Sequence, residues 1–157
     1  MKTAIIYYSK HHGNTEKLLK AIQSHSDDTI VLIDISQVAH PNLESYDRIG
    51  YASGIYYSKF NKQLIEFAQN NTPHNKEVFF IYTCGQKRSG YTKTIQEALI
   101  GKNCKILGEY GCLGFNTFGP LKLIGGMCKG HPTNDELNGA AKFYNNLKND
   151  DYNPHFL

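Results

Sequence analysis

A short polar segment near the N-terminus, SKHHGNT at residues 9–15, contains the first residues whose types could do chemistry. It offers hydroxyl, imidazole, amide and ammonium donors together with a glycine, and it contains no carboxylate. An apolar run precedes it and a helical pattern follows it. The N-terminus of a helix presents unpaired N–H groups and the positive end of the helix dipole, so this segment is suited to binding a phosphate group. The residues expected to form the phosphate site are Ser9, Lys10, His11, His12, Gly13, Asn14 and Thr15.

The same segment has a plainer interpretation, in which it only starts a helix and Asn14 or Thr15 hydrogen-bonds its own backbone. It matches neither the Walker A loop, since no Gly-Lys-Ser/Thr follows, nor the GxGxxG fingerprint of dinucleotide sites. Its two histidines are adjacent, so their side chains point apart and make a poor metal pair. A phosphate monoester held mainly by neutral donors fits the segment best.

Two later segments place small residues and aromatic rings directly after apolar runs. The first is SGIYY at residues 53–57, and the second is TCGQKRSGY at residues 83–91. A planar ligand could stack on Tyr56 or Tyr57 while nearby backbone groups hydrogen-bond its edge. In the plainer alternative the rings only cover the end of the sheet. Together with the phosphate segment, these two predict a ligand with a phosphate tail and a flat head.

The elements that must position these segments alternate along the chain. Short apolar runs, typical of strands buried on both faces of a parallel sheet, occur at residues 4–8, 29–33, 49–52, 78–82 and 106–113. Helical patterns involve residues 18–22, 60–68, 95–99 and 137–147, and Thr133 with Glu136 forms a capping box before the last of them. Residues 34–46 contain Pro41 and have room only for a short or broken helix. The alternation predicts a three-layer α/β fold with a doubly wound, five-stranded parallel sheet.

In such a sheet the ligand lies outside the carboxyl ends of the strands, where the loops expected are residues 9–15, 53–62, 83–93 and 111–131. These four loops contain eight of the 17 basic residues and none of the 14 acidic residues. The basic residues are Lys10, Lys59, Lys62, Lys87, Arg88, Lys93, Lys122 and Lys129. Clefts lined by one sign of charge attract ligands of the other, so we expect an anionic partner, either an acidic protein surface or the phosphates of NADPH. In the plainer alternative the charges are a solvated rim, screened by salt.

Composition excludes several classes of protein. A chain of 157 residues with 40% apolar and 20% charged residues suits one globular domain spanning residues 1–157. No apolar run approaches the length of a membrane span and the N-terminus does not resemble a signal peptide, so we expect a cytoplasmic protein without membrane insertion. A net charge of +3 gives no reason to expect nucleic acid. The four cysteines form no CxxC pair, so free thiols are favoured over disulfides or a metal site.

The combination of a phosphate loop and two aromatic loops resembles the flavodoxin family. YYSKHHGNTEKLLKAI is similar to the loop that holds the FMN phosphate in that family, GYASGIYYSKFNKQL to the first flavin loop, and FIYTCGQ to the second. The resemblance covers nearly the whole chain, is closest to the short-chain members, and implies the strand order 2-1-3-4-5. It also implies flavin contacts from Ser53, Gly54, Ile55, Tyr56, Tyr57, Thr83, Cys84 and Gly85. The adjacent Ala52, and Tyr91 at the end of the third segment, complete the residues expected to bind the cofactor. The chain departs from the family pattern where three residues, rather than two, separate Ser9 from Gly13, and where His12 replaces a threonine.

The resemblance implies an FMN-binding redox protein that carries electrons to or from a protein partner, with no catalytic residue of its own. An alternative is an NAD(P)H-dependent FMN reductase of quinones or similar small acceptors. A phosphoacceptor receiver module has the same sheet order, but it requires an acid after the first strand and an aspartate after the third, where this chain has Ser9 and Ser53. Cys84 could be a redox-active thiol, although a small residue packed beneath a ring is the commoner case.

Overall fold

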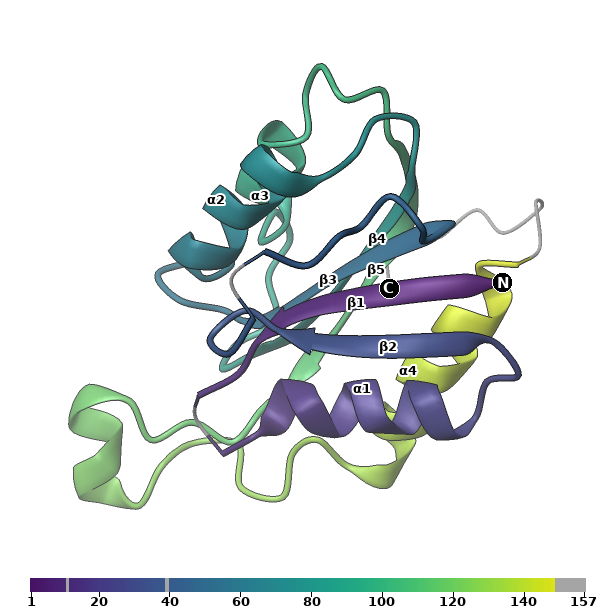
Figure 1. Cartoon of the computed structure of the whole chain (residues 1–157). Coiled ribbons are helices and arrows are strands. Elements are labelled where there is room, and N and C mark those ends of the chain that lie inside the picture. Colours follow the sequence, from purple (N-terminus) through teal and green to yellow (C-terminus); the bar gives the residue numbers. More distant parts are fainter. Residues whose placement is uncertain (11, 39, 149–157) are drawn as a thin grey trace.

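The computed structural model describes residues 1–10, 12–38 and 40–148. Its elements follow one another in the predicted alternation (Figure 1). The strands are β1 (Lys2–Tyr8), β2 (Thr29–Asp34), β3 (Arg48–Gly54), β4 (Glu77–Cys84) and β5 (Lys105–Leu113). The helices are α1 (Asn14–Ser24), α2 (Lys62–Asn71), α3 (Lys93–Glu97), the 3-10 helix η1 (Gly119–Ile124) and α4 (Asn134–Asn146).

The five strands form one parallel sheet in the order β2-β1-β3-β4-β5, as predicted. Tyr8 at the end of β1 is in register with Ser53, and Gly54 at the end of β3 is in register with Thr83. The carboxyl ends of these three strands therefore lie side by side at one edge. The loops that follow them are brought together by the register of the sheet.

Helices cover both faces of the sheet, because alternate residues of each strand point to opposite faces and both sets are apolar. On one face Leu18 and Ile22 of α1 pack with Tyr144 of α4 against β-strand residues such as Ile5. On the other face Leu64 of α2 and Ile95 of α3 pack against residues such as Phe80. In Figure 1, α1 and α4 lie along one side of the sheet and α2 and α3 along the other. The predicted three-layer architecture is confirmed.

Two local expectations need correction. The described residues between β2 and β3 contain turns but no helix, so Pro41 lies in an irregular crossover. The helical pattern at residues 95–99 becomes a helix only over Lys93–Glu97. Beyond Ala98 the backbone hydrogen bonds change from the i→i−4 to the i→i−3 type, as in Leu99 N to Gln96 O and Ile100 N to Glu97 O. The chain tightens into turns there and reaches Gly101 at φ +86°.

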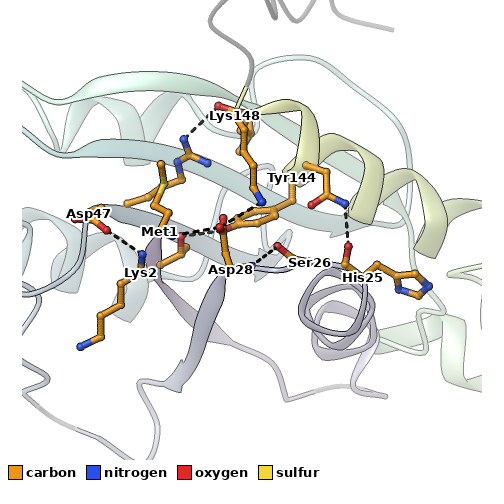
Figure 2. A network of polar contacts seen from close by, with 12 residues as sticks. Met1, Lys2, His25, Ser26, Asp28, Asp47, Tyr144 and Lys148 are labelled. Atoms are coloured by element: carbon orange, nitrogen blue, oxygen red, sulfur yellow. Dashed lines mark hydrogen bonds and ion pairs between the residues drawn. The ribbon is translucent and has the colours of Figure 1, made fainter.

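At the opposite edge of the sheet, a polar network connects the start of β2 to the end of α4 (Figure 2). The buried Asp28 carboxylate accepts hydrogen bonds from the Tyr144 hydroxyl at 3.0 Å and from the amino terminus at 3.4 Å, and it pairs with Lys148 at 3.2 Å. The Asn145 amide donates to the carbonyl oxygen of His25. This network holds α4 against α1 and β2, far from the loops at the carboxyl ends of the strands.

Candidate functional site

A pocket of about 430 Å³ opens at the carboxyl ends of β1, β3, β4 and β5. This size lies within the usual range for small-molecule sites. All four of the predicted loops contribute to it, including the segment that follows β5. Its lining residues are Ser9, Lys10, Asn14, Thr15, Gly54, Ile55, Tyr56, Tyr57, Thr83, Cys84, Gly85, Gly114, Phe115, Asn116 and Phe118.

The first loop leads from β1 directly into the N-terminus of α1. Gly13 is the residue before the helix, and it has φ +61°, a left-handed conformation that glycine adopts without strain. Among the described residues no side chain caps the N-terminus of this helix, although Asn14 and Thr15 begin it and line the pocket. The first-turn N–H groups of α1 therefore lie beside the pocket without a side-chain cap, which is the arrangement expected of an anion site.

Asn14 connects this loop to the segment after β5. Its side-chain amide donates to the carbonyl oxygen of Phe115 at 2.7 Å, which fixes the orientation of the amide group. The other amide atom, Oδ1, is buried without a hydrogen-bond partner among the described residues. Because buried polar atoms are almost always hydrogen-bonded in folded proteins, this oxygen is an acceptor suited to a donor on a ligand in the pocket. Its neighbour Thr15 bonds Thr83 through their hydroxyls at 3.1 Å, which joins the first loop to β4.

The second loop is held rigidly by its own backbone. Ile55 N–H donates to Thr83 O at 2.9 Å, and Tyr56 and Lys59 exchange two backbone hydrogen bonds. The fully buried Ser53 hydroxyl donates to Gly54 O at 2.6 Å and accepts from Asn61 N. Ser53 therefore shapes the loop, while Gly54, Ile55 and Tyr56 form the wall of the pocket.

Two tyrosines of this loop differ in their surroundings. Tyr56 packs edge-on against Tyr8, with ring centroids 6.2 Å apart, and burial raises its pKa. Tyr57 is 85% exposed and meets the edge of Phe118 at 6.3 Å across the mouth of the pocket. The flat walls of the pocket thus include Tyr56, Tyr57 and Phe118, all of which can pack against a planar ring.

The third loop contributes a thiol that is not activated. Cys84 is buried and donates to the Cys112 carbonyl oxygen at 3.4 Å. Burial raises its pKa to about 11, although Lys87 acts in the opposite direction. A cysteine of this kind is a neutral thiol near pH 7, so it acts as a small packing residue. No group of three or more metal-ligating side chains occurs among the described residues.

Sequence reasoning assigned no contacts to the segment after β5, yet it forms one side of the pocket. The Asn116 amide lies so close to Gly85 that a Cβ there would be 3.2 Å from it, and a Cβ at Gly114 would lie 3.0 Å from Asn14 and Thr83. The His12 ring bonds the Thr117 hydroxyl at 2.8 Å and packs on Phe115 with centroids 4.5 Å apart. The available signal was the position of residues 111–131 at this edge; the contacts themselves required the fold.

Some predicted site residues lie next to the pocket and not in its lining. His12 and Gly13 shape the turn into α1, while Ala52 and Ser53 are fully buried in β3. Tyr91 is buried against Tyr82, and its hydroxyl donates to Gln86 O at 2.6 Å, so its ring supports the third loop from behind. His11 lies outside the described residues.

The charge around the pocket has one sign. Lys10 is the charged residue in the lining, and its ammonium lies 5.4 Å from the Tyr8 ring centroid. Among the described residues, Lys10, Lys59, Lys87, Arg88, Lys122 and Lys129 form no ion pair with a carboxylate. Glu16, in the first turn of α1, is paired with Lys20 at 2.7 Å. The pocket and its rim therefore favour an anion.

A family model described as a flavodoxin domain matches residues 5–107, which include the first three loops of the pocket. The chain belongs to the flavodoxin family. It is also 39% identical over 145 residues to the uncharacterized protein MJ0298 of Methanocaldococcus jannaschii, covering 91% of this chain and 95% of that protein. The predicted family membership is confirmed.

Solved structures share the fold of this flavodoxin-family chain. One is a flavodoxin from the domain Archaea, with a TM-score of 0.65, 18% identity, and coverage of 94% of this chain and 99% of the other. Another is a Fusobacterium nucleatum flavodoxin mutant bound to flavin mononucleotide, with a TM-score of 0.66, 12% identity, and coverage of 94% and 95%. Within the part of the chain that the structure describes, no helix has the length and apolar character of a membrane span.

Proposed function

We propose that this protein binds FMN in the pocket at the carboxyl ends of the strands and carries electrons to or from a protein partner. The observation that carries the proposal is the pocket itself, which joins an uncapped helix N-terminus to flat aromatic walls. When bound, FMN supplies the redox chemistry, and the protein supplies binding, orientation and electrostatic tuning. Family membership and the FMN-bound relative support this choice of cofactor.

The donors and acceptors of the pocket fit the parts of FMN. The backbone N–H groups at the start of α1, with Ser9 and Thr15, suit the phosphate, and Lys10 adds a positive charge. The unpartnered Oδ1 of Asn14 is an acceptor, so it suits a hydroxyl of the ribityl chain better than a phosphate oxygen. The ring system fits between the second loop, with Tyr56 and Tyr57, and the third loop, with Thr83, Cys84 and Gly85.

The basic rim favours an acidic partner and a less negative flavin potential. Lys87 and Arg88 are exposed on the third loop, two and three residues after Gly85, and neither forms an ion pair with a described carboxylate. Positive charge beside a bound flavin stabilises its negatively charged reduced form, which raises the potential. The same charges attract acidic protein surfaces at low ionic strength.

The proposal is tested with the purified protein. We expect a yellow protein whose released cofactor is FMN by chromatography and mass, and whose colourless apoprotein regains its absorbance when FMN is added. A protein purified without flavin, whose apoprotein does not bind FMN, would refute the proposal. Release of FAD would also refute it, because the pocket would then hold a second nucleotide.

The NAD(P)H-dependent reductase remains the second candidate, favoured by the same Lys87 and Arg88, which suit the phosphates of NADPH. Steady-state oxidation of NADPH by the FMN-loaded protein alone, with a quinone as acceptor, separates the two functions. A carrier is expected to turn over slowly without a protein partner. Rapid saturable turnover would assign the reductase.

A further inference from the structure

The segment between β5 and α4 forms a projection that the pocket requires only in part. We call residues 116–127 the lobe. Asn116 and Met127 close its neck through two backbone hydrogen bonds of 2.9 and 2.7 Å, and η1 lies inside it. Figure 1 shows this pale green segment extending away from the sheet and helices. Its base contributes Asn116 and Phe118 to the pocket, while its tip has no contact with the cofactor site.

The tip of the lobe is apolar and uncovered. No residue of η1 is buried. Leu123 is 89% exposed and Ile124 is 73% exposed, and the exposed Phe118 and Met127 extend the apolar surface back to the pocket. Single exposed apolar residues are ordinary, but a contiguous group on a projecting segment marks an interaction site.

The lobe is nevertheless an ordered element. Gly126 N–H donates to Leu121 O at 2.7 Å, and the Asn116 side chain accepts from Phe118 N at 2.8 Å. Gly126 has φ +89°, and a Cβ there would lie 2.6 Å from the Phe115 ring and 2.9 Å from Asn116 O, so the neck closes too tightly for a side chain. These contacts fix the backbone of the lobe, so its exposed apolar side chains are held in one arrangement.

Positive charges lie on the lobe itself and on the loops of the adjacent pocket. Lys122 is on η1, and the Lys129 ammonium would lie only 3.2 Å from a Cβ at Gly125. Lys10 and Lys59 come from the first two loops of the pocket. No acidic residue occurs between Glu109 and Asp135. Stable protein interfaces have this arrangement, with aromatic residues and methionine at the centre and charges at the rim.

We propose that the lobe, together with Tyr57 at the mouth of the pocket, is the docking element for a redox partner that presents an apolar hollow within an acidic rim. The proposal rests on the proposed function, since it needs a flavin in the adjacent pocket. A second copy of the chain would bring the same positive charges against this surface, which disfavours it. A bilayer would engage the tip alone, whereas the aromatic residues and the lysines extend over three loops of the rim.

The test uses the FMN-loaded protein and an acidic plant-type ferredoxin as electron donor, with the basic cytochrome c as the contrasting partner. The second-order rate constant of electron transfer is measured from low to high salt. We expect a faster reaction with ferredoxin at low salt and a decline as salt increases. Leu123→Ser with Ile124→Ser should lower the ferredoxin rate constant about 10-fold at every salt concentration.

Two matched controls isolate the lobe. Ile100→Ser removes an apolar side chain that is 80% exposed beyond α3, near the start of β5, and should leave the rate constant unchanged. Lys122→Gln with Lys129→Gln should slow the reaction at low salt only. Lys20→Gln with Lys142→Gln makes the same change in net charge on α1 and α4 and should have a much smaller effect.

The outcomes separate the possible occupants. The apoprotein variants should bind FMN as tightly as the parent, because Leu123 and Ile124 do not line the pocket. If the parent does not bind FMN, the proposed function itself fails. If FMN binds but the lobe variants react as the parent does, the docking proposal alone is overturned. It is also overturned if these variants abolish sedimentation with phosphatidylglycerol vesicles, or dissociate a dimer, while the ferredoxin reaction is unchanged.

Discussion

The amide of Asn14 offers a sharp test of the cofactor site. In Asn14→Asp, the group that donates to Phe115 O at 2.7 Å is replaced by a carboxylate, which can only accept. The residue is 94% buried beside the pocket, so the new negative charge lies close to the phosphate of FMN. The variant therefore combines a lost hydrogen bond with electrostatic repulsion.

The lost hydrogen bond and the electrostatic repulsion differ in size and in the ligands that they affect. An unsatisfied buried carbonyl costs about 1–3 kcal/mol and weakens the pocket for any flavin. Repulsion between the carboxylate and the phosphate adds roughly 3 kcal/mol for each phosphate charge at about 5 Å and an effective dielectric constant of about 20. The repulsion alone corresponds to a factor of about 100 or more, and it multiplies the loss shared by both flavins. We therefore expect FMN affinity to fall by about 1,000-fold or more, and the affinity for riboflavin, which lacks the phosphate, by about 10-fold.

Titration of the apoprotein, followed by quenching of flavin fluorescence, measures both affinities. Asn71→Asp is the matched control, because the Asn71 amide also donates to a backbone carbonyl, Phe67 O at 3.1 Å, at the far end of α2. Lowering the pH should reduce the deficit of Asn14→Asp, since a protonated carboxyl is neutral and can donate to Phe115 O. Equal losses for FMN and riboflavin would show that the phosphate does not lie beside Asn14, and the assignment would fail.

Gly13→Val places a β-branched residue at φ +61°, so it should lower the affinity for FMN at least about 10-fold and the affinity for riboflavin less. The control Gly101→Val introduces similar backbone strain at φ +86°, away from the pocket, and should leave both affinities unchanged in the same titration. Burial by itself raises the pKa of Asp28, but hydrogen bonds from Tyr144, Lys148 and the amino terminus outweigh it and hold the pKa below its ordinary value. This stabilisation is present above about pH 4 and is lost as the pH falls through the folded-state pKa. Asp28→Asn should therefore lower the free energy of unfolding by about 1–3 kcal/mol at pH 7, with a difference in urea denaturation that narrows towards pH 3. Lys87→Gln with Arg88→Gln should lower the midpoint potential of the bound flavin by roughly 20–40 mV in a redox titration, and an unchanged potential would show that these charges act on the flavin too weakly to tune it.

The architecture was determined largely by local pattern. Apolar runs such as Ile49–Ala52 can be strands of a parallel sheet only if helices cover both faces, and the capping box at Thr133 fixes the start of α4 from residues adjacent in sequence. The polar segment between β1 and α1 could also be predicted as an anion site from the sequence, because a helix N-terminus needs partners for its N–H groups whatever the rest of the fold is. These features depend on spacing within a few residues, which the sequence states directly.

The details of the site depended on contacts between residues far apart in the chain. From the sequence, Asn14 was expected to donate to the phosphate. In the structure its Nδ2 donates to Phe115 O, 101 residues away, so the atom left without a partner is the acceptor Oδ1. Tyr91 looked like a ring for stacking, yet it is buried against Tyr82. The helical pattern at residues 95–99 was also overridden, since its last residues take up turns that lead into β5.

The lobe shows most clearly which features follow from local sequence and which depend on long-range contacts. From the sequence, residues 111–131 could be placed at the edge of the sheet where ligands bind, because β5 must end there. Whether they would cover the pocket or project from it was decided by the closed neck at Asn116 and Met127 and by the bond from Asn14 to Phe115, the residue before the lobe. Periodicity reports which face of an element is apolar, but only the packing of the whole chain decides which apolar residues remain uncovered.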